Sequence, residues 1–204
     1  MRRASGIITV SDTITARARS IAPAVPAMTL EDLALGGVLP PEEALVAKLK
    51  QEFEVDSHDV LLSTGNFEPY QGIDLLLESF AKFVTNANEG KKPRLVLVGG
   101  GNPSDARFQF YRSKVADLGI VKEVIFAGQR SESEMEAYMA VAQILLSPRI
   151  AGAHTPLKIY TYMAANKPIV ATRIAAHVNV LNHENSFLSE PDAESFAQMM
   201  RSAL

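Results

Sequence analysis

The chain has 204 residues, 47% of them hydrophobic, with a formal net charge of −3 at pH 7 and a pI near 5.8. This length suits one large domain, or one domain with a fragment of another, and the apolar content is sufficient for a core. The acidic balance argues against nucleic-acid binding, and the absence of cysteine excludes disulfides and thiolate metal sites. No apolar run is long enough to span a bilayer, so we expect a cytoplasmic protein.

The pattern of residues 1–40 predicts a single strand–helix–strand unit. Residues 6–10 form an apolar run, Ser11 or Asp12 can cap a helix that ends near residue 20, and a short extended segment follows at residues 27–30. Glycine and proline at positions 36–41 then indicate a linker. One such unit cannot bury both faces of its strands, so we expect residues 1–40 to be the remnant of a larger domain truncated at its N-terminal side.

Residues 41–204 show a regular alternation of helix and strand patterns. Short apolar runs predict strands at residues 60–64, 94–98, 124–127, 143–147, 168–171 and 187–188. Helical patterns are expected at residues 42–53, 72–84, 108–118, 131–140 and 156–165, and from 192 to the end. Apolar strands that alternate with helices are typical of parallel sheets covered on both faces. The predicted class is therefore α/β, with a doubly wound parallel sheet.

Three loops that follow predicted strands carry glycine, at residues 65–72, 99–103 and 128–130. Ligands of open α/β sheets bind at this edge, where glycine lets the backbone approach a phosphate closely. Taken alone, each loop is weak evidence, because glycine after a strand often only forms a turn. The second loop lacks the G-x-G-x-x-G spacing and the expected acidic residue, which argues against a dinucleotide site.

Residues 147–172 run from the end of one predicted strand through the next, and the start of the helix within them indicates a binding site. Thr155 is expected to be the N-cap, Pro156 the first helical residue, and Asn166 a left-handed C-cap. Lys158 then lies near the positive end of the helix dipole, where a cation is mildly unfavourable. An anion bound at the same helix start would explain this lysine.

The distribution of charge supports the same interpretation. No Asp or Glu occurs between residues 137 and 183, although Arg149, Lys158, Lys167 and Arg173 lie there. One explanation is a buried part of the sheet that lacks charges of both signs. We favour an electropositive pocket for a phosphorylated ligand, because the basic residues remain.

These patterns together resemble a known family. Residues 64–74, 98–101, 126–128 and 155–172 are similar to the C-terminal half of family-4 retaining glycosyltransferases, also called glycosyl transferases group 1. Such enzymes have the GT-B architecture, in which two Rossmann-like domains face each other across a cleft. The resemblance implies that residues 41–204 are the Rossmann-like nucleotide-sugar-binding domain. Residues 1–40 would then be the remnant of the N-terminal, acceptor-side domain with its linker.

The resemblance also implies an activity: glycosyl transfer, of the EC 2.4 type, from a UDP- or GDP-type sugar with retention, in glycan or cell-surface polysaccharide synthesis. The implied partners are the nucleoside-diphosphate sugar and an acceptor glycan or lipid bound through the N-terminal domain, with no metal or other cofactor. A full-length enzyme would be cytoplasmic or peripheral at the membrane. The isolated chain would have low activity and could form homo-oligomers through exposed apolar surface. The alternative is a non-catalytic nucleotide-binding or interaction module; a sugar-nucleotide epimerase would need acid/base carboxylates that this segment lacks.

The implied site departs from the family pattern. Asn66 and Gln71 stand where the family has basic residues that contact the diphosphate, and the paired glutamates of the family would fall near Ala153 and Thr161. Either Lys158 with Arg149 neutralises the diphosphate, or the site is degenerate. The competing interpretations are a solvated helix lysine for Lys158 and a loop-pinning role for Arg149.

No catalytic residue is assigned from the sequence, and His177 with His183 lacks a third metal ligand. The residues expected to bind the nucleotide sugar are Gly65, Asn66, Phe67, Gln71, Gly72, Gly99, Gly100, Gly128, Gln129, Arg130, Arg149, Gly152, Thr155, Pro156, Leu157, Lys158 and Thr161.

Overall fold

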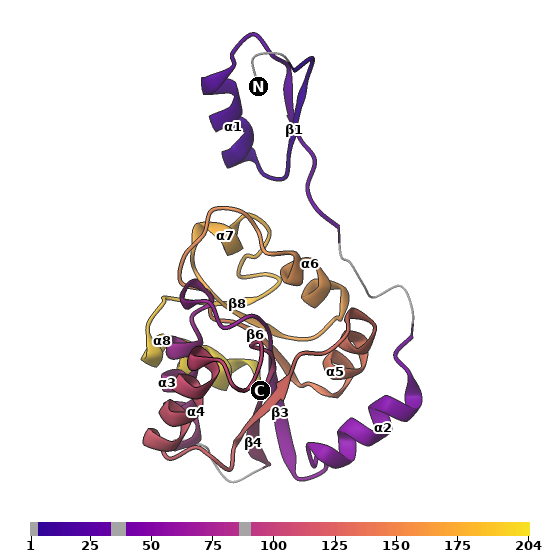
Figure 1. The fold of residues 1–204 in the computed structure, drawn as a ribbon, viewed down its shortest axis with the longest axis vertical. Helices are drawn as coiled ribbons and strands as arrows, with labels where there is room; N and C mark the ends of the chain where they lie inside the picture. Colours follow the sequence, from indigo (N-terminus) through magenta and orange to yellow (C-terminus); the bar gives the residue numbers. More distant parts are fainter. Residues whose placement is uncertain (1–3, 34–39, 86–90) are drawn as a thin grey trace.

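A computed structural model describes residues 4–33, 40–85 and 91–204 of the chain (Figure 1). The first part contains β1 (Ile7–Thr9), α1 (Asp12–Ile21) and β2 (Ala27–Thr29). The second part begins with α2 (Glu43–Glu52), β3 (His58–Gly65), η1 (Pro69–Gln71), α3 (Ile73–Thr85), β4 (Lys92–Gly99), α4 (Ala106–Asp117) and β5 (Val124–Gly128). It continues with η2 (Glu132–Glu134), α5 (Met135–Val141), β6 (Ile144–Ser147), α6 (Leu157–Ala164), β7 (Ile169–Thr172), α7 (Ala175–Val178), β8 (Phe187–Ser189) and α8 (Ala193–Ala203).

The larger sheet has six parallel strands in the order β5-β4-β3-β6-β7-β8. If the strands of this sheet are numbered along the chain, so that β3 is strand 1 and β8 is strand 6, their order across the sheet is 3-2-1-4-5-6. This is the strand order of a Rossmann fold. The predicted class of a doubly wound parallel α/β sheet is therefore confirmed. The order reverses between β3 and β6, and such a reversal point is where open α/β sheets bind ligands.

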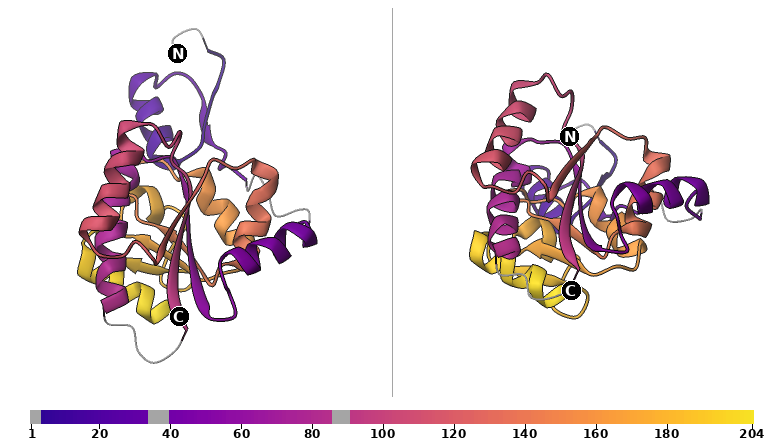
Figure 2. Two further views of the ribbon diagram at one scale, coloured as in Figure 1. Left: turned by 60° about the horizontal axis from the view of Figure 1, so that its bottom comes forward. Right: turned by 90° about the horizontal axis from the view of Figure 1, so that it is seen from below.

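Helices cover both faces of this sheet (Figures 1 and 2). Alternate residues of each strand point to opposite faces, so Leu61 and Leu95 join one apolar layer while Val60 and Val96 join the other. The first layer includes buried side chains of α3, α4 and α8, and the second includes those of α2, α5 and α6. This double burial explains why the strands read as continuous apolar runs in the sequence.

The predicted strand–helix–strand unit is present, and its strands β1 and β2 form a separate two-stranded parallel sheet with α1 on one face. The Ser11 hydroxyl caps α1 by accepting a hydrogen bond from the amide of Ile14. The opposite face is apolar and open, with Ile8 and Met28 paired across the strands at 65% and 55% exposure. In Figure 1 this unit lies beyond α6 and α7, at one end of the molecule.

Three details complete the fold. The sequence patterns did not predict the single turns η1 and α7, which are too short for a helical period to show. The glycines of the predicted linker, Gly36 and Gly37, lie outside the described residues. Among the helices that the structure describes, none combines the length and the apolar character that a membrane span requires.

Candidate functional site

The loops that follow β3 and β6 meet at the reversal point of the sheet. The backbone amide of Ile150 donates to the carbonyl of Tyr70 at 2.9 Å, which ties the two loops together. Gly72 has φ +72°, and a Cβ atom there would lie only 2.0 Å from the carbonyl oxygen of Pro148. Because Gly72 has no side chain, the two loops can approach each other closely. Gly72 therefore contributes to the shape of the site through its backbone.

The helix α6 starts behind these loops but is capped differently from the prediction. Its N-cap is Pro156, and no side chain caps it. The expectation that Thr155 caps this helix is therefore wrong. The Thr155 side chain is buried, and its hydroxyl oxygen accepts from the Asn179 amide at 3.3 Å. No side chain satisfies the first amides of α6, and the amide of Ile159 donates to the carbonyl of Pro156 at 2.9 Å, so among the described residues the amides of Leu157 and Lys158 are the ones left for an anion. Asn166 has φ +53°, in agreement with the predicted left-handed end of the helix.

Lys158 points from the first turn of α6 toward the end of β3. Its Nζ donates to the carbonyl oxygen of Thr64 at 3.0 Å, and the hydroxyl of Tyr162 lies 2.9 Å from both the amide and the Oγ1 of Thr64. Lys158 is half-buried, and this burial, together with the charge of Arg149, lowers the pKa of Lys158 to about 8. The interpretation of Lys158 as a solvated helix lysine is therefore wrong.

Arg149 lies just beyond β6 and is only 7% exposed. Its Nε donates to the carbonyl of Ala151 at 2.7 Å, and its guanidinium lies 4.9 Å from the centroid of the Tyr70 ring. Gly152, at φ +137°, makes room for this arrangement, because a Cβ there would lie 2.7 Å from an Arg149 terminal nitrogen. Arg149 does pin its loop, as one of the two interpretations held. In the part of the chain that the structure describes, its terminal nitrogens have no hydrogen-bond partner.

The two cations leave the site short of negative charge. Neither Arg149 nor Lys158 forms an ion pair with any carboxylate of the described residues. The Nζ of Lys158 and the Nε2 of Gln71 lie 4.0 and 3.7 Å from the position of a Cβ on Gly65. The Oε1 of Gln71 is buried without a hydrogen-bond partner within the described ranges. Because buried cations are costly unless they are paired, this cluster is suited to hold an anion with several oxygen atoms.

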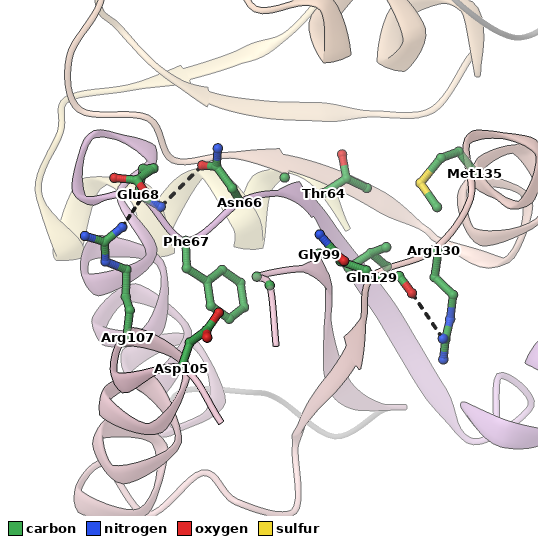
Figure 3. Close-up of a pocket in the computed structure, with 14 residues that line it drawn as sticks. Thr64, Asn66, Phe67, Glu68, Gly99, Asp105, Arg107, Gln129, Arg130 and Met135 are labelled. Carbon is green, nitrogen blue, oxygen red and sulfur yellow. Dashed lines mark hydrogen bonds and ion pairs between the residues drawn. The ribbon is translucent and has the colours of Figure 1, made fainter. Parts of the chain in front are cut away.

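Two cavities open beside this cluster. The first has a volume of about 410 Å³ and lies at the ends of β3, β4 and β5. In Figure 3, Asn66, Glu68 and Arg107 lie on one side of it, and Arg130 with Met135 lies on the other. The second, of about 180 Å³, lies between α5 and α6 and includes Lys158, Thr161 and Tyr162 in its wall. Thr64 and Met135 line both cavities, so the two are neighbours.

Most of the predicted residues lie at this edge of the sheet, but in different roles. Those that line the first cavity are Gly65, Asn66, Phe67, Gly99, Gly100, Gln129 and Arg130. Those that line the second are Leu157, Lys158 and Thr161. The remaining predicted residues line neither cavity, and they are Gln71, Gly72, Gly128, Arg149, Gly152, Thr155 and Pro156. Phe67 is only 4% exposed and packs in an aromatic group with Phe108 and Phe126, so it serves the core as well as the cavity wall.

The sequence analysis missed two residues that shape the site from behind. His177 is fully buried, with its ring between Ser147 of β6 and Thr172 of β7. Asn179 follows α7, and its side-chain amide donates to the carbonyl of Ala153 and to Thr155, which holds the loop before α6. Both roles depend on contacts between segments that are distant in the chain, and no local pattern in the sequence indicated them.

Comparison with known proteins shows a family for this chain. The chain matches the family described as Glycosyl transferases group 1 over residues 58–204. It is 24% identical over 148 residues to the D-inositol 3-phosphate glycosyltransferase of Jonesia denitrificans, covering 72% of this chain and 35% of that protein. It is 26% identical over 147 residues to the N-acetyl-alpha-D-glucosaminyl L-malate synthase of Bacillus anthracis, covering 71% and 36%.

Solved structures show the same fold. Anabaena HepE in complex with UDP superposes with a TM-score of 0.82 at 20% identity, covering 98% of this chain and 54% of that one. The sucrose-phosphate synthase of Thermosynechococcus elongatus gives a TM-score of 0.79 at 21% identity, covering 98% and 49%. The chain thus spans about half the length of these structures and about a third of the length of the curated relatives.

Proposed function

Because this chain belongs to the family of glycosyl transferases group 1, we propose that it is the donor-binding domain of a glycosyltransferase. In this proposal it binds a UDP- or GDP-type sugar, and the sugar is transferred to an acceptor glycan or lipid with retention of configuration. The observation that carries the proposal is the pair of unneutralised cations, Arg149 and Lys158, at the reversal point of the sheet. A diphosphate supplies the negative charge that this pair lacks.

The diphosphate would lie over Gly65, between the side-chain Nζ of Lys158 and the backbone amides at the N-terminus of α6. Lys158 uses one of its three N–H donors on Thr64, so two remain for phosphate oxygens. The uncapped amides at the start of α6 add donors and a favourable dipole. Since a leaving diphosphate gains charge as the glycosidic bond breaks, the same groups would stabilise the transition state. In this proposal the cations of the chain neutralise the diphosphate without a metal ion.

The nucleoside would occupy the two cavities. In this proposal the base would lie in the first cavity, next to Gln129 and Arg130, and the ribose would lie in the second, where Thr161 lines the wall. Support for UDP as the nucleotide comes from the Anabaena protein, which has this fold and was solved with UDP and UDP-glucose. The side chain of Arg130 is engaged with Tyr138 at 2.7 Å, so backbone contacts at residues 128–130 would hold the base.

A second candidate is a nucleotide-binding module without transferase activity. The absence of a carboxylate at Thr161, where the family pattern places the ribose-binding glutamate, favours it. The two candidates share donor binding and differ in whether the glycosidic bond breaks.

Calorimetric titration with UDP, GDP and ADP, and with uridine, guanosine and adenosine, tests the proposal directly. We expect one of the diphosphates to bind at least about tenfold more tightly than its nucleoside, because charged hydrogen bonds contribute roughly 1.5–3 kcal/mol each. Equal affinities for UDP and uridine, and for GDP and guanosine, would refute the anion site. Release of free sugar from the preferred donor, measured by chromatography, then separates an enzyme from a binding module.

A further inference from the structure

The buried ring of His177 makes hydrogen bonds whose directions can all be assigned. Its Nδ1 lies 2.8 Å from the carbonyl oxygen of Thr172, which can only accept, so Nδ1 carries the proton. Nδ1 also lies 3.2 Å from the Oγ1 of Thr172, which accepts from it. The hydroxyl of Thr172 in turn donates to the carbonyl oxygen of Arg149. The Nε2 atom lies 3.0 Å from the Ser147 hydroxyl and accepts from it. One ring thereby links β6, β7 and α7 directly behind the candidate anion site.

We propose that His177 is a positioning residue: with Thr172 it holds the backbone of Arg149 so that the guanidinium lies beside Lys158 in the diphosphate site. The inference rests on the proposed function, because it assigns His177 to the same anion. Arg149 begins the loop that leads to α6, and its carbonyl is the point at which that loop is fastened to β7. If this fastening is lost, the guanidinium can move away from Lys158 while the rest of the sheet stays intact.

The charge state of the ring is consistent with this role. Burial, together with the charges of Lys158 and Arg149, lowers the pKa of His177 to about 4, although the hydrogen bond to the Thr172 carbonyl acts in the opposite direction. A neutral ring has one donor and one acceptor, which is what Thr172 and Ser147 require. A charged ring would add a third cation to a cluster that already lacks a counter-charge.

A set of variants separates positioning from simple structural support. In His177→Leu the hydrogen bonds of the ring to Ser147 and Thr172 are all lost, and we expect UDP affinity to fall about tenfold while uridine affinity changes less than twofold. In His177→Asn the side-chain amide can still donate toward Thr172, so we expect most of the UDP affinity to return. Ser147→Ala removes only the contact to Nε2 and serves as the control, with an expected change below twofold. Thr172→Val removes the hydroxyl that donates to Arg149, and we expect it to behave like His177→Leu.

The possible results distinguish this inference from the proposed function. If the wild-type chain binds neither UDP more tightly than uridine nor GDP more tightly than guanosine, the proposed function is refuted, and if GDP is the preferred nucleotide, the variants are compared with GDP and guanosine. If that preference exists and Thr172→Val and a folded His177→Leu retain it, the positioning role is refuted. Equal losses of UDP and uridine affinity would also refute it, because they indicate general disruption. Should His177→Leu not fold, Thr172→Val still decides the question. The imidazole ¹⁵N spectrum of the wild-type protein gives an independent reading: we expect a neutral ring with the proton on Nδ1, and a proton on Nε2 would contradict the assignment.

Discussion

At the scale of single residues, the affinity for the phosphates is expected to depend most strongly on Lys158. In Lys158→Met one charged donor is lost, so we expect UDP to bind roughly ten- to a hundredfold more weakly, while the loss for uridine is much smaller. The free energy of unfolding should stay the same or increase, because a half-buried cation is removed from beside Arg149 and from the positive end of a helix. Titration calorimetry and thermal unfolding measure both effects.

Lys91 provides a matched control for this substitution. Its Nζ also donates to a backbone carbonyl, that of Val55 at 2.8 Å, but outside both cavities. Lys91→Met should therefore leave UDP affinity unchanged. Unchanged affinity in Lys158→Met would mean that the anion binds at a different helix.

The lowered pKa of Lys158 also predicts how UDP binding depends on pH. Below pH 8 the lysine is charged in the free protein, whereas above pH 8 binding must first take up a proton. A bound diphosphate raises the pKa of this lysine, so affinity should fall as the pH rises. Between pH 7 and pH 9 we expect the affinity for UDP to fall about tenfold, because the charged fraction of a lysine with a pKa of about 8 falls about tenfold over this range. The slope approaches its limit of about 1.36 kcal/mol per pH unit only above pH 8. In Lys158→Met this slope should disappear, and a slope that persists would assign the titration to another group.

At the scale of elements, the close contact of two loops determines the shape of the site. In Gly72→Ala a methyl group would collide with the carbonyl of Pro148, and the residue would also have to keep a positive φ. Gly119 has nearly the same φ, +71° against +72°, but nothing lies within 4 Å of its missing Cβ. Gly119→Ala should cost about 1–2 kcal/mol of stability from the left-handed backbone alone. Gly72→Ala should cost at least about 2 kcal/mol more in urea unfolding, from the added collision. Equal losses would show that the loops separate freely.

The same scale shows what could be predicted from the sequence. Strands such as β3 and β4 are buried on both faces, so their apolar runs showed their positions directly. The helices were found from their periodicity and caps, and Ser11 caps α1 as expected. Thr155 was misassigned because its hydroxyl is used by Asn179, a partner in a distant segment. The role of His177 was missed for the same reason, since its ring contacts Ser147 from 30 residues away. Local patterns therefore predicted the elements and the edge of the sheet, but not the contacts between loops.

At the scale of the whole molecule, the open face of the β1–β2 sheet should make the chain associate. Ile8 and Met28 are paired across this face and largely exposed, and exposed apolar surface of this kind promotes association. We expect the average mass in sedimentation to increase with concentration, and Ile8→Lys with Met28→Lys to abolish the increase. Val121, exposed to 60%, is the control, and Val121→Lys should have no effect. A wild-type chain that remains monomeric at high concentration would contradict this prediction.

The reversal of strand order also has a consequence for the kinetics of folding. The contact between Lys158 and Thr64 joins residues 94 apart in the chain, and the bond from the Val60 amide to Gln143 spans 83. Closing loops of this length has a high entropic cost, so we expect these contacts to form after β3, β4 and β5 have already paired. A ligand held by Lys158 would then stabilise contacts that are absent from the folding transition state. Such a ligand slows unfolding and leaves the rate of folding nearly unchanged.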